Sequence, residues 1–186
     1  MCERDIVLQY TLTCANNTPT DEDALWQMLF YAAQMPKDGV SDYRVAQTTP
    51  SVAPYVADWG LVGDVGIIAR ADQRVCGAVW LRAVPPDCTT GYYPAATHKL
   101  AIAVHPDYHG HGIGTTLMHG ICAIADQVRW CLSLTVRADN RAVALYRRHQ
   151  FVVAETIINR VGTPSSLMVR HQANCVHIDD KGRMTR

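Results

Sequence analysis

The sequence predicts an α/β fold of mixed α+β character, in which helices cover a mixed sheet. Two apolar runs at 65–70 and 75–82 flank a short turn and form a hairpin pattern. A strand, a glycine loop and a helix follow over 97–128, and a second strand with its helix covers 131–149. Hairpins give antiparallel neighbours and a strand–helix–strand crossover gives parallel ones, so we expect both in one sheet.

The amino-acid composition is typical of a globular protein and does not indicate a nucleic-acid or membrane partner. The 186 residues suit one domain with a real core, and 48% hydrophobic and 18% charged residues are ordinary for a globular protein. The formal net charge is zero, so no cationic excess indicates a nucleic-acid partner. No apolar run approaches the roughly 20 residues of a membrane span, and the first ten residues lack a signal-peptide core. We therefore expect a cytoplasmic protein with no nucleic-acid and no membrane partner.

Cysteine and histidine patterns do not indicate a metal centre. The seven cysteines are irregularly spaced and include no Cys-x-x-Cys pair, so we expect thiols and no zinc site. His105, His109 and His111 lie close together in the glycine loop, but no carboxylate-rich helix accompanies them. We interpret them as loop histidines and expect no metal.

The first third of the chain predicts one strand and one long helix. Residues 6–12 alternate apolar and polar side chains, as a strand does. Thr20 is the expected N-cap of a helix that ends near Met35-Pro36. Residues 37–54 are expected to form a loop with at most a short helix, and 53–59 another short helix.

The remainder continues from the hairpin, where Gly77 indicates a bulge or a close backbone approach. Residues 84–94 are expected to be a loop. The sequence pattern then predicts a strand, a helix, a strand, a helix and two strands, over 97–105, 113–128, 131–137, 140–149, 151–161 and 166–170. We expect a single domain over 1–170 and a polar, partly disordered tail over 171–186.

The glycine loop at the start of the second long helix predicts a phosphate site. Gly110, Gly112 and Gly114 let a ligand approach the backbone, and the unpaired amides of the first helical turn favour an anion. The loop lacks the Gly-Lys-Ser/Thr ending of a P-loop, and its glycine spacing is too short for a dinucleotide fingerprint. A tight turn that uses the glycines only for geometry is the alternative.

Two segments together resemble the GNAT (GCN5-related N-acetyltransferase) superfamily. Residues 104–114, VHPDYHGHGIG, resemble the family's acyl-CoA motif Arg/Gln-x-x-Gly-x-Gly/Ala. Residues 140–151, NRAVALYRRHQF, resemble Asn-x-x-Ala-x-x-Leu-Tyr-x-x-x-Gly-Phe, with Asn140 one position closer to the alanine than in that pattern. One helix and one strand separate the segments, as in the family, and the element order agrees from Ile6 to about Arg170. The resemblance implies a mixed, mostly antiparallel central sheet that splays between its fourth and fifth strands and is flanked by helices.

The sequence departs from the family pattern at two positions. His109 stands where Arg or Gln is usual, so the phosphates would rest mainly on backbone amides. Gln150 stands where Gly is usual, and a non-glycine residue in a left-handed cap costs about 1 kcal/mol.

The resemblance implies an N-acetyltransferase that moves an acetyl group from acetyl-CoA to a primary amine of a small molecule or peptide by direct attack. The strand at 102–104 would hold the pantetheine arm, and a backbone amide near Ala103 or Val104 would polarise the thioester carbonyl. Asn140 would hydrogen-bond the pantetheine end, or cap its helix, or do both. The implied cofactor-binding residues are Ile102, Ala103, Val104, His109, Gly110, His111, Gly112, Ile113, Gly114, Thr115, Asn140 and Tyr146.

The candidates for the two catalytic roles, proton donor to the leaving thiolate and general base, are Tyr146 and His98. Tyr146 holds the family's tyrosine position, and its phenol could supply a proton to the leaving thiolate; the alternative is a core aromatic. For the general base, many relatives carry a Glu on the strand before the loop, where this chain has Lys99. His98 is the candidate by its pKa, with Ser133 and Tyr93 as lesser ones.

The acceptor pocket should come from the loops at 37–59 and 85–93 and from the last hairpin. Their carboxylates and aromatics suit a cationic amine, although surface solvation explains them equally well: Asp38, Asp42, Asp58, Asp87, Tyr43, Tyr55, Trp59, Tyr92 and Tyr93. Two other functions stay open, a non-catalytic acyl-CoA-binding sensor module and an unrelated α/β nucleotide-binding protein. Many relatives dimerise, which leaves a homodimer open.

Overall fold

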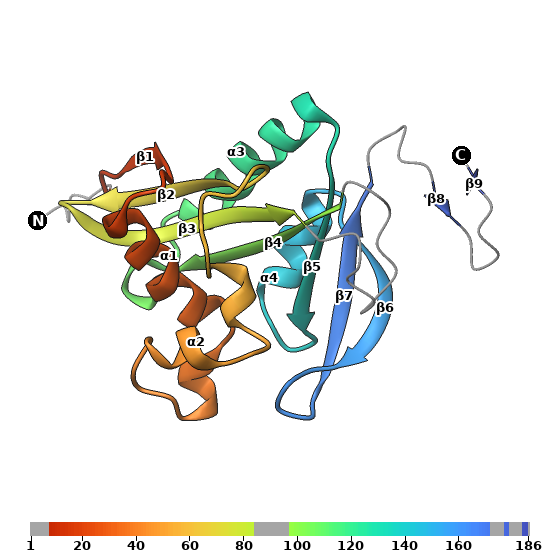
Figure 1. Ribbon diagram of the computed structural model, residues 1–186, viewed down its shortest axis with the longest axis horizontal. Helices are drawn as coiled ribbons and strands as arrows, with labels where there is room; N and C mark the ends of the chain where they lie inside the picture. The colour runs from red at the N-terminus through yellow and green to blue at the C-terminus, as the bar shows by residue number, and fades with distance from the viewer. Residues whose placement is uncertain (1–7, 84–96, 172–176, 179–183, 186) are drawn as a thin grey trace, which may run out of the picture.

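The computed structural model describes residues 8–83, 97–171, 177–178 and 184–185, and its centre is a seven-stranded sheet (Figure 1). The strand order is β1-β2-β3-β4-β5-β7-β6, and every neighbouring pair is antiparallel except β4 and β5. The predicted mixed sheet is confirmed. The strands are β1 Thr11–Cys14, β2 Val65–Ala71, β3 Arg74–Ala83, β4 Thr97–Val104, β5 Cys131–Arg137, β6 Val152–Ile158 and β7 Pro164–Arg170. In the tail, β8 His177–Ile178 pairs antiparallel with β9 Met184–Thr185.

Helices cover both faces of the sheet. α1 (Pro19–Ala32) and α2 (Val45–Thr48) pack on one face, and α3 (Ile113–Val128) and α4 (Ala142–Arg148) on the other (Figure 1). Successive strand residues point to opposite faces, so Ile67 joins the core under α3 while Ile68 joins the core under α1. Short 3-10 turns lie at Met35–Asp38, Ala53–Tyr55 and Pro106–Tyr108.

Gly77 in β3 marks a close backbone approach, as predicted. A Cβ there would lie 3.0 Å from the carbonyl oxygen of Ala103 in β4 and 3.2 Å from the Leu117 side chain in α3. The register between β2 and β3 also shifts between Ala69 and Arg70, opposite this glycine. The absence of a side chain here lets α3 lie directly on β3 and β4.

The N-terminal boundaries differ from the sequence predictions. The first strand covers 11–14 and not 6–12 within the described residues, because its extent is set by pairing with Ile67–Arg70 of β2. Thr18, not Thr20, caps α1: its hydroxyl accepts the Asp21 amide, and Pro19 takes the first helical position, where no amide partner is needed.

The short helix predicted over 53–59 is reduced to a 3-10 turn at 53–55. Two side chains of β3 take the carbonyl groups that a longer helix would use. The Trp80 indole donates to the Tyr55 carbonyl at 2.8 Å, and the Arg82 guanidinium donates to that of Ala57. These bonds tie the segment to the sheet instead.

In the C-terminal half, the observed helices and strands lie close to the positions that the sequence predicts. The helix at 113–128 and the strand at 131–137 are confirmed at both ends, and the helix predicted at 140–149 covers 142–148. The last two strands cover 152–158 and 164–170, because the Asn159 side chain closes a turn between them. Its Nδ2 donates to Thr163, and its Oδ1 accepts the Val161 amide.

The cysteines follow the expectation only in part. Cys14, Cys76 and Cys122 are free thiols. Cys131, at the start of β5, is disulfide-bonded, so the expectation of a thiol is wrong there. Among the described helices, none has the length and apolar character needed to cross a membrane.

Candidate active site

A cleft opens where β4 and β5 separate. The two strands pair in parallel only at Thr97–Lys99, and β4 has no β5 partner from Leu100 onward. Figure 1 shows them diverging from this short paired region. The predicted splay is confirmed, and it leaves a cavity of about 1110 Å³ whose walls include one edge of β4 at 100–104.

Eleven of the twelve residues expected to hold the cofactor line this cleft. They come from β4, from the glycine loop with the start of α3, and from the α4 segment, and they are Ile102, Ala103, Val104, His109, Gly110, Gly112, Ile113, Gly114, Thr115, Asn140 and Tyr146. The remaining residue, His111, lies in the same loop outside the lining. Segments distant in sequence therefore form one continuous wall.

The glycine loop leaves space in front of the first turn of α3. Gly110 and Gly112 have left-handed φ values of +84° and +76°, and a Cβ on either would meet nothing within 4 Å. Gly112 is the N-cap of α3 and supplies no side-chain capping bond. The first amides of the helix thus face an open volume, and this arrangement fits the phosphate groups of a coenzyme A.

His109 and His111 stabilise the loop through backbone carbonyls. His109 Nε2 donates to the Val104 carbonyl at 2.9 Å, and His111 Nδ1 donates to the His109 carbonyl at 3.0 Å. A carbonyl only accepts, so each of these ring nitrogens carries its proton. The His109 ring therefore holds the loop against β4, which leaves anion binding to the backbone amides.

Asn140 caps α4 and also lines the cleft. Its Oδ1 accepts the Ala142 amide at 2.9 Å, so the predicted capping role is present in the structure. Its Nδ2 makes no hydrogen bond to another described residue. That amide group is available to a ligand in the cleft.

Tyr146 is a buried tyrosine whose side chain lines the cleft. It is 6% exposed, its ring packs against Phe151 with centroids 6.0 Å apart, and its hydroxyl makes no hydrogen bond within the described residues. Burial raises the pKa of Tyr146 well above its ordinary value of 10. The phenol therefore stays neutral and able to donate a hydrogen bond over the whole working pH range.

The candidates for the general base lie elsewhere. His98 is 5% exposed and stacks on Trp130 with ring centroids 3.8 Å apart, and it is not part of the cleft lining. Ser133 is buried, and its hydroxyl donates to the His98 carbonyl, bridging β4 and β5. Tyr93 lies outside the described residues. The geometry thus lends no support to His98 as the base, and the assignment stays a prediction.

Gln150 occupies the left-handed position that its place in the motif predicts. Its φ is +67°, directly after α4. We expect Gln150→Gly to raise the free energy of unfolding by about 1 kcal/mol, because glycine adopts this conformation without strain. Urea unfolding measures the change. Gln47→Gly within α2 is the control, and it should lower stability by a similar amount; a loss of stability in both variants would contradict the assignment.

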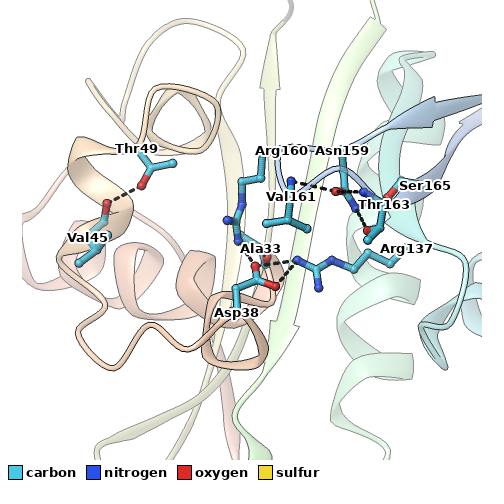
Figure 2. A network of polar contacts seen from close by, with 10 residues as sticks. All are labelled: Ala33, Asp38, Val45, Thr49, Arg137, Asn159, Arg160, Val161, Thr163 and Ser165. Atoms are coloured by element: carbon cyan, nitrogen blue, oxygen red, sulfur yellow. Dashed lines mark hydrogen bonds and ion pairs between the residues drawn. The ribbon is translucent and has the colours of Figure 1, made fainter.

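Three charged side chains meet across the cleft from distant parts of the chain (Figure 2). Asp38 follows α1, Arg137 ends β5, and Arg160 lies in the turn between β6 and β7. Arg137 Nη2 donates to both Asp38 oxygens at 2.8 and 2.7 Å, and Arg160 Nη2 donates to Asp38 and to the Ala33 carbonyl. Sequence reasoning named only Asp38. No motif or periodicity in the sequence relates Arg137 and Arg160 to it, because the contacts join residues 99 and 122 positions apart.

The residues that the structure describes do not assemble the expected cation-binding pocket. Asp38 is paired with two arginines, Asp42 lies beside Arg44 at 3.8 Å, and the Tyr43 hydroxyl donates to Asp23 at 2.7 Å. Of the residues expected in that pocket, Tyr55 is part of the lining; Asp58 is exposed, Trp59 is buried, and neither lines the cleft. Asp87, Tyr92 and Tyr93 lie outside the described residues. The described carboxylates of this set are thus paired with arginines or lie outside the lining, and the charged side chains of the cleft lining are mainly cationic.

The ion pairs of Asp38 predict an acid-sensitive contribution to stability. Burial alone would raise the pKa of Asp38, but the hydrogen bonds and charges of Arg137 and Arg160 lower it below its ordinary value of 3.8. A lowered folded-state pKa stabilises the protein above the unfolded pKa, and this stabilisation is lost as pH falls through the folded value. We expect Asp38→Asn to lower the free energy of unfolding at pH 7, and this loss to become progressively smaller as pH falls below the ordinary value of 3.8 toward the lower folded-state pKa. Urea unfolding at pH 7 and at a series of acidic pH values tests this, and a loss that does not shrink in acid would contradict it.

Comparison with known proteins agrees with this geometry. The family model described as "Acetyltransferase (GNAT) domain" matches residues 63–153, a range that contains the splayed strands, the glycine loop, α3 and α4. The chain belongs to the GNAT acetyltransferase superfamily. The alternative of an unrelated nucleotide-binding protein is therefore wrong. No curated protein matches the chain significantly in sequence.

Solved GNAT structures share the fold at low sequence identity. An acyl-CoA N-acyltransferase from Pseudomonas aeruginosa is 19% identical with a TM-score of 0.61, covering 87% of this chain and 99% of that one. A ribosomal-protein-alanine N-acetyltransferase from Brucella melitensis is 18% identical with a TM-score of 0.62, covering 86% and 99%. A chimeric spermidine N-acetyltransferase that contains the Vibrio cholerae enzyme is 16% identical with a TM-score of 0.60, covering 87% and 96%.

Proposed function

We propose that this GNAT protein transfers the acetyl group of acetyl-CoA to a primary amine of a small molecule or peptide by direct attack. One observation carries the proposal: the glycine-capped start of α3, the unpaired edge of β4 and the buried Tyr146 all line a single cleft. The similar structures are named for different acceptors, a ribosomal-protein alanine and spermidine. Their likeness supports the fold and the reaction class, and it leaves the acceptor open.

Different parts of the cleft would bind different parts of acetyl-CoA. Backbone amides from Gly110 to Gly114 would hold the pyrophosphate, and the β4 edge together with Asn140 Nδ2 would hold the pantetheine arm. Acetyl-CoA supplies an activated thioester. A β4 amide near Ala103 or Val104 would polarise its carbonyl where negative charge develops.

Tyr146 would stabilise the leaving sulfur by a hydrogen bond. Its raised pKa makes full proton transfer to a thiolate, whose thiol has an ordinary pKa near 8.5, unfavourable. The neutral phenol can nevertheless donate a hydrogen bond to sulfur as negative charge builds there. The attacking nitrogen loses one proton as the amide bond forms and the C–S bond breaks, and the departing thiolate takes up one proton, so the transfer balances.

The acceptor amine must lose its proton before it attacks. An alkylamine has a pKa near 10, so we expect kcat/KM to rise with pH between about 7 and 9. Because Tyr146 stays neutral, no fall from phenol ionisation is expected below about pH 10. Initial rates across this range measure the profile, and a fall in kcat near pH 8 or 9 that Tyr146→Phe removes would contradict it.

The buried position of His98 leads to a separate expectation. We expect His98→Ala to lower the free energy of unfolding and to leave the pH profile of kcat/KM unchanged, because its ring packs on Trp130 away from the cleft lining. Pairing the pH profile with urea unfolding measures both effects. A profile that loses its lower limb in the variant would restore His98 as the base.

Release of free thiol from acetyl-CoA in the presence of amines tests the proposed function. A non-catalytic acyl-CoA-binding module would bind the thioester and release no thiol. A homodimer stays a prediction.

A further inference from the structure

The cluster Asp38–Arg137–Arg160 has one positive charge in excess. Both arginines line the cleft, and a single carboxylate faces their two guanidinium groups. Each guanidinium carries five N–H donors, and in both residues Nη2 makes the contacts to described protein groups. The other nitrogens have no acceptor among the described residues. These remaining nitrogens are partly buried hydrogen-bond donors, and the three-residue cluster to which they belong has a net positive charge.

Such an arrangement is suited to a carboxylate ligand. Arginine forks bind carboxylates in bidentate geometry, and the side chains of Arg137 and Arg160 are only 18% and 23% exposed. Lys37 lines the same region and adds to its positive potential. Water screens such partly enclosed charges less than surface charges.

A hydrogen-bond acceptor without a partner lies in the same wall. Gln34 lines the cleft and is 9% exposed, and its Oε1 is buried with no hydrogen-bond partner in the described part of the chain. Its backbone is left-handed, with φ +55°, so the chain turns there directly after α1. Buried polar atoms are normally satisfied, and an N–H group of a ligand would satisfy this one.

Building on the proposed function, we propose that Arg137 and Arg160 bind a carboxylate of the acceptor, so that the preferred substrates are amines that also carry a carboxylate. A free amino acid is the simplest molecule of this class. Asp38 is a positioning residue: it bridges the two arginines (Figure 2), both of which line the cleft.

The turn between β6 and β7 sets the position of Arg160. Its turn is closed by Asn159, which donates to Thr163 and Ser165 and accepts the Val161 amide (Figure 2). This closed turn holds Arg160 over the cleft, where its side chain reaches both Asp38 and the Ala33 carbonyl. The β6–β7 turn and the end of α1 therefore form one binding surface.

Matched acceptor pairs test the proposal. Tryptophan and tryptamine, like tyrosine and tyramine, differ in structure by the carboxylate, which also lowers the pKa of the amine, so kcat/KM is calculated on the concentration of neutral amine. In thiol-release assays we expect this kcat/KM to favour the amino acid by about tenfold or more, the effect of one charge-assisted contact. In Arg160→Gln and Arg137→Gln this preference should disappear through a higher KM for the amino acid, and Arg160→Lys should restore part of it. Arg44→Gln, an exposed arginine outside the lining, is the control and should keep the wild-type preference.

The possible outcomes separate the inference from the proposed function. Wild-type protein that uses the amines as well as the amino acids overturns the inference and leaves the acetyltransferase intact. Absence of transfer to every acceptor overturns the proposed function. Calorimetric titration of the CoA-saturated protein with N-acetyltryptophan and N-acetyltryptamine then tests the arginine site without turnover. Tighter binding of the former that is lost in Arg160→Gln supports the site, and equal binding overturns it.

Discussion

Tyr146→Phe is expected to lower kcat by about tenfold or more with the fold intact. The ring is buried against Phe151, so phenylalanine fills the same volume, and only the hydroxyl is lost. That hydroxyl has no partner among the described residues, so its removal leaves no protein group unsatisfied. The effect should fall on the breakdown of the thioester and leave the affinity for CoA unchanged.

The control for this variant is Tyr43→Phe. Its hydroxyl donates to Asp23 outside the cleft lining, so the change should cost about 1 kcal/mol of stability and leave kcat at the wild-type value. Steady-state rates should be measured under conditions where chemistry limits turnover. An unchanged kcat in Tyr146→Phe would contradict the role of the phenol at the leaving sulfur.

Gly112→Ala is expected to weaken CoA binding by about tenfold or more. The added methyl group would enter the open volume in front of the first turn of α3, where the amides would meet phosphate. The left-handed φ of +76° also strains any side chain, at about 1–2 kcal/mol. A loss of affinity alone could therefore reflect strain.

Gly162→Ala separates these two effects. Gly162 has φ +78° in the turn after β6, a Cβ there also meets nothing within 4 Å, and it does not line the cleft. Both variants should lose similar stability in urea unfolding, and only Gly112→Ala should lose CoA affinity by calorimetry. Equal affinity of the two variants would contradict the assignment of the α3 start as the phosphate site.

The elements that the sequence predicts well are those set by local chemistry. α3 begins and ends where expected, because Gly112 and the apolar spacing from Ile113 to Val128 act within one segment. The left-handed Gln150 follows from its place after α4 in the same way. The first strand and the 53–59 segment differ, because their extent depends on β2 and on Trp80 and Arg82, which lie elsewhere in the chain.

The same contrast between local and long-range contacts decides which parts of the candidate site the sequence predicts. The cofactor wall could be predicted because each of its two motifs is continuous in sequence. The contacts of Asp38 with Arg137 and Arg160 join residues 99 and 122 positions apart, and no periodicity relates them. His98 illustrates the converse: its intrinsic pKa suggested a base, but the direction of its side chain along β4 depends on the tertiary fold.

The central claim is acetyl transfer to an amine, and the most direct measurement is thiol release from acetyl-CoA with mass analysis of the acceptor. A panel of amines and their amino-acid counterparts should include at least one that gains an acetyl group in step with thiol release. Tyr146→Phe should slow both by about tenfold or more. Binding of acetyl-CoA with no acceptor-dependent thiol release and no acetylated product would contradict the account and favour a non-catalytic acyl-CoA-binding module.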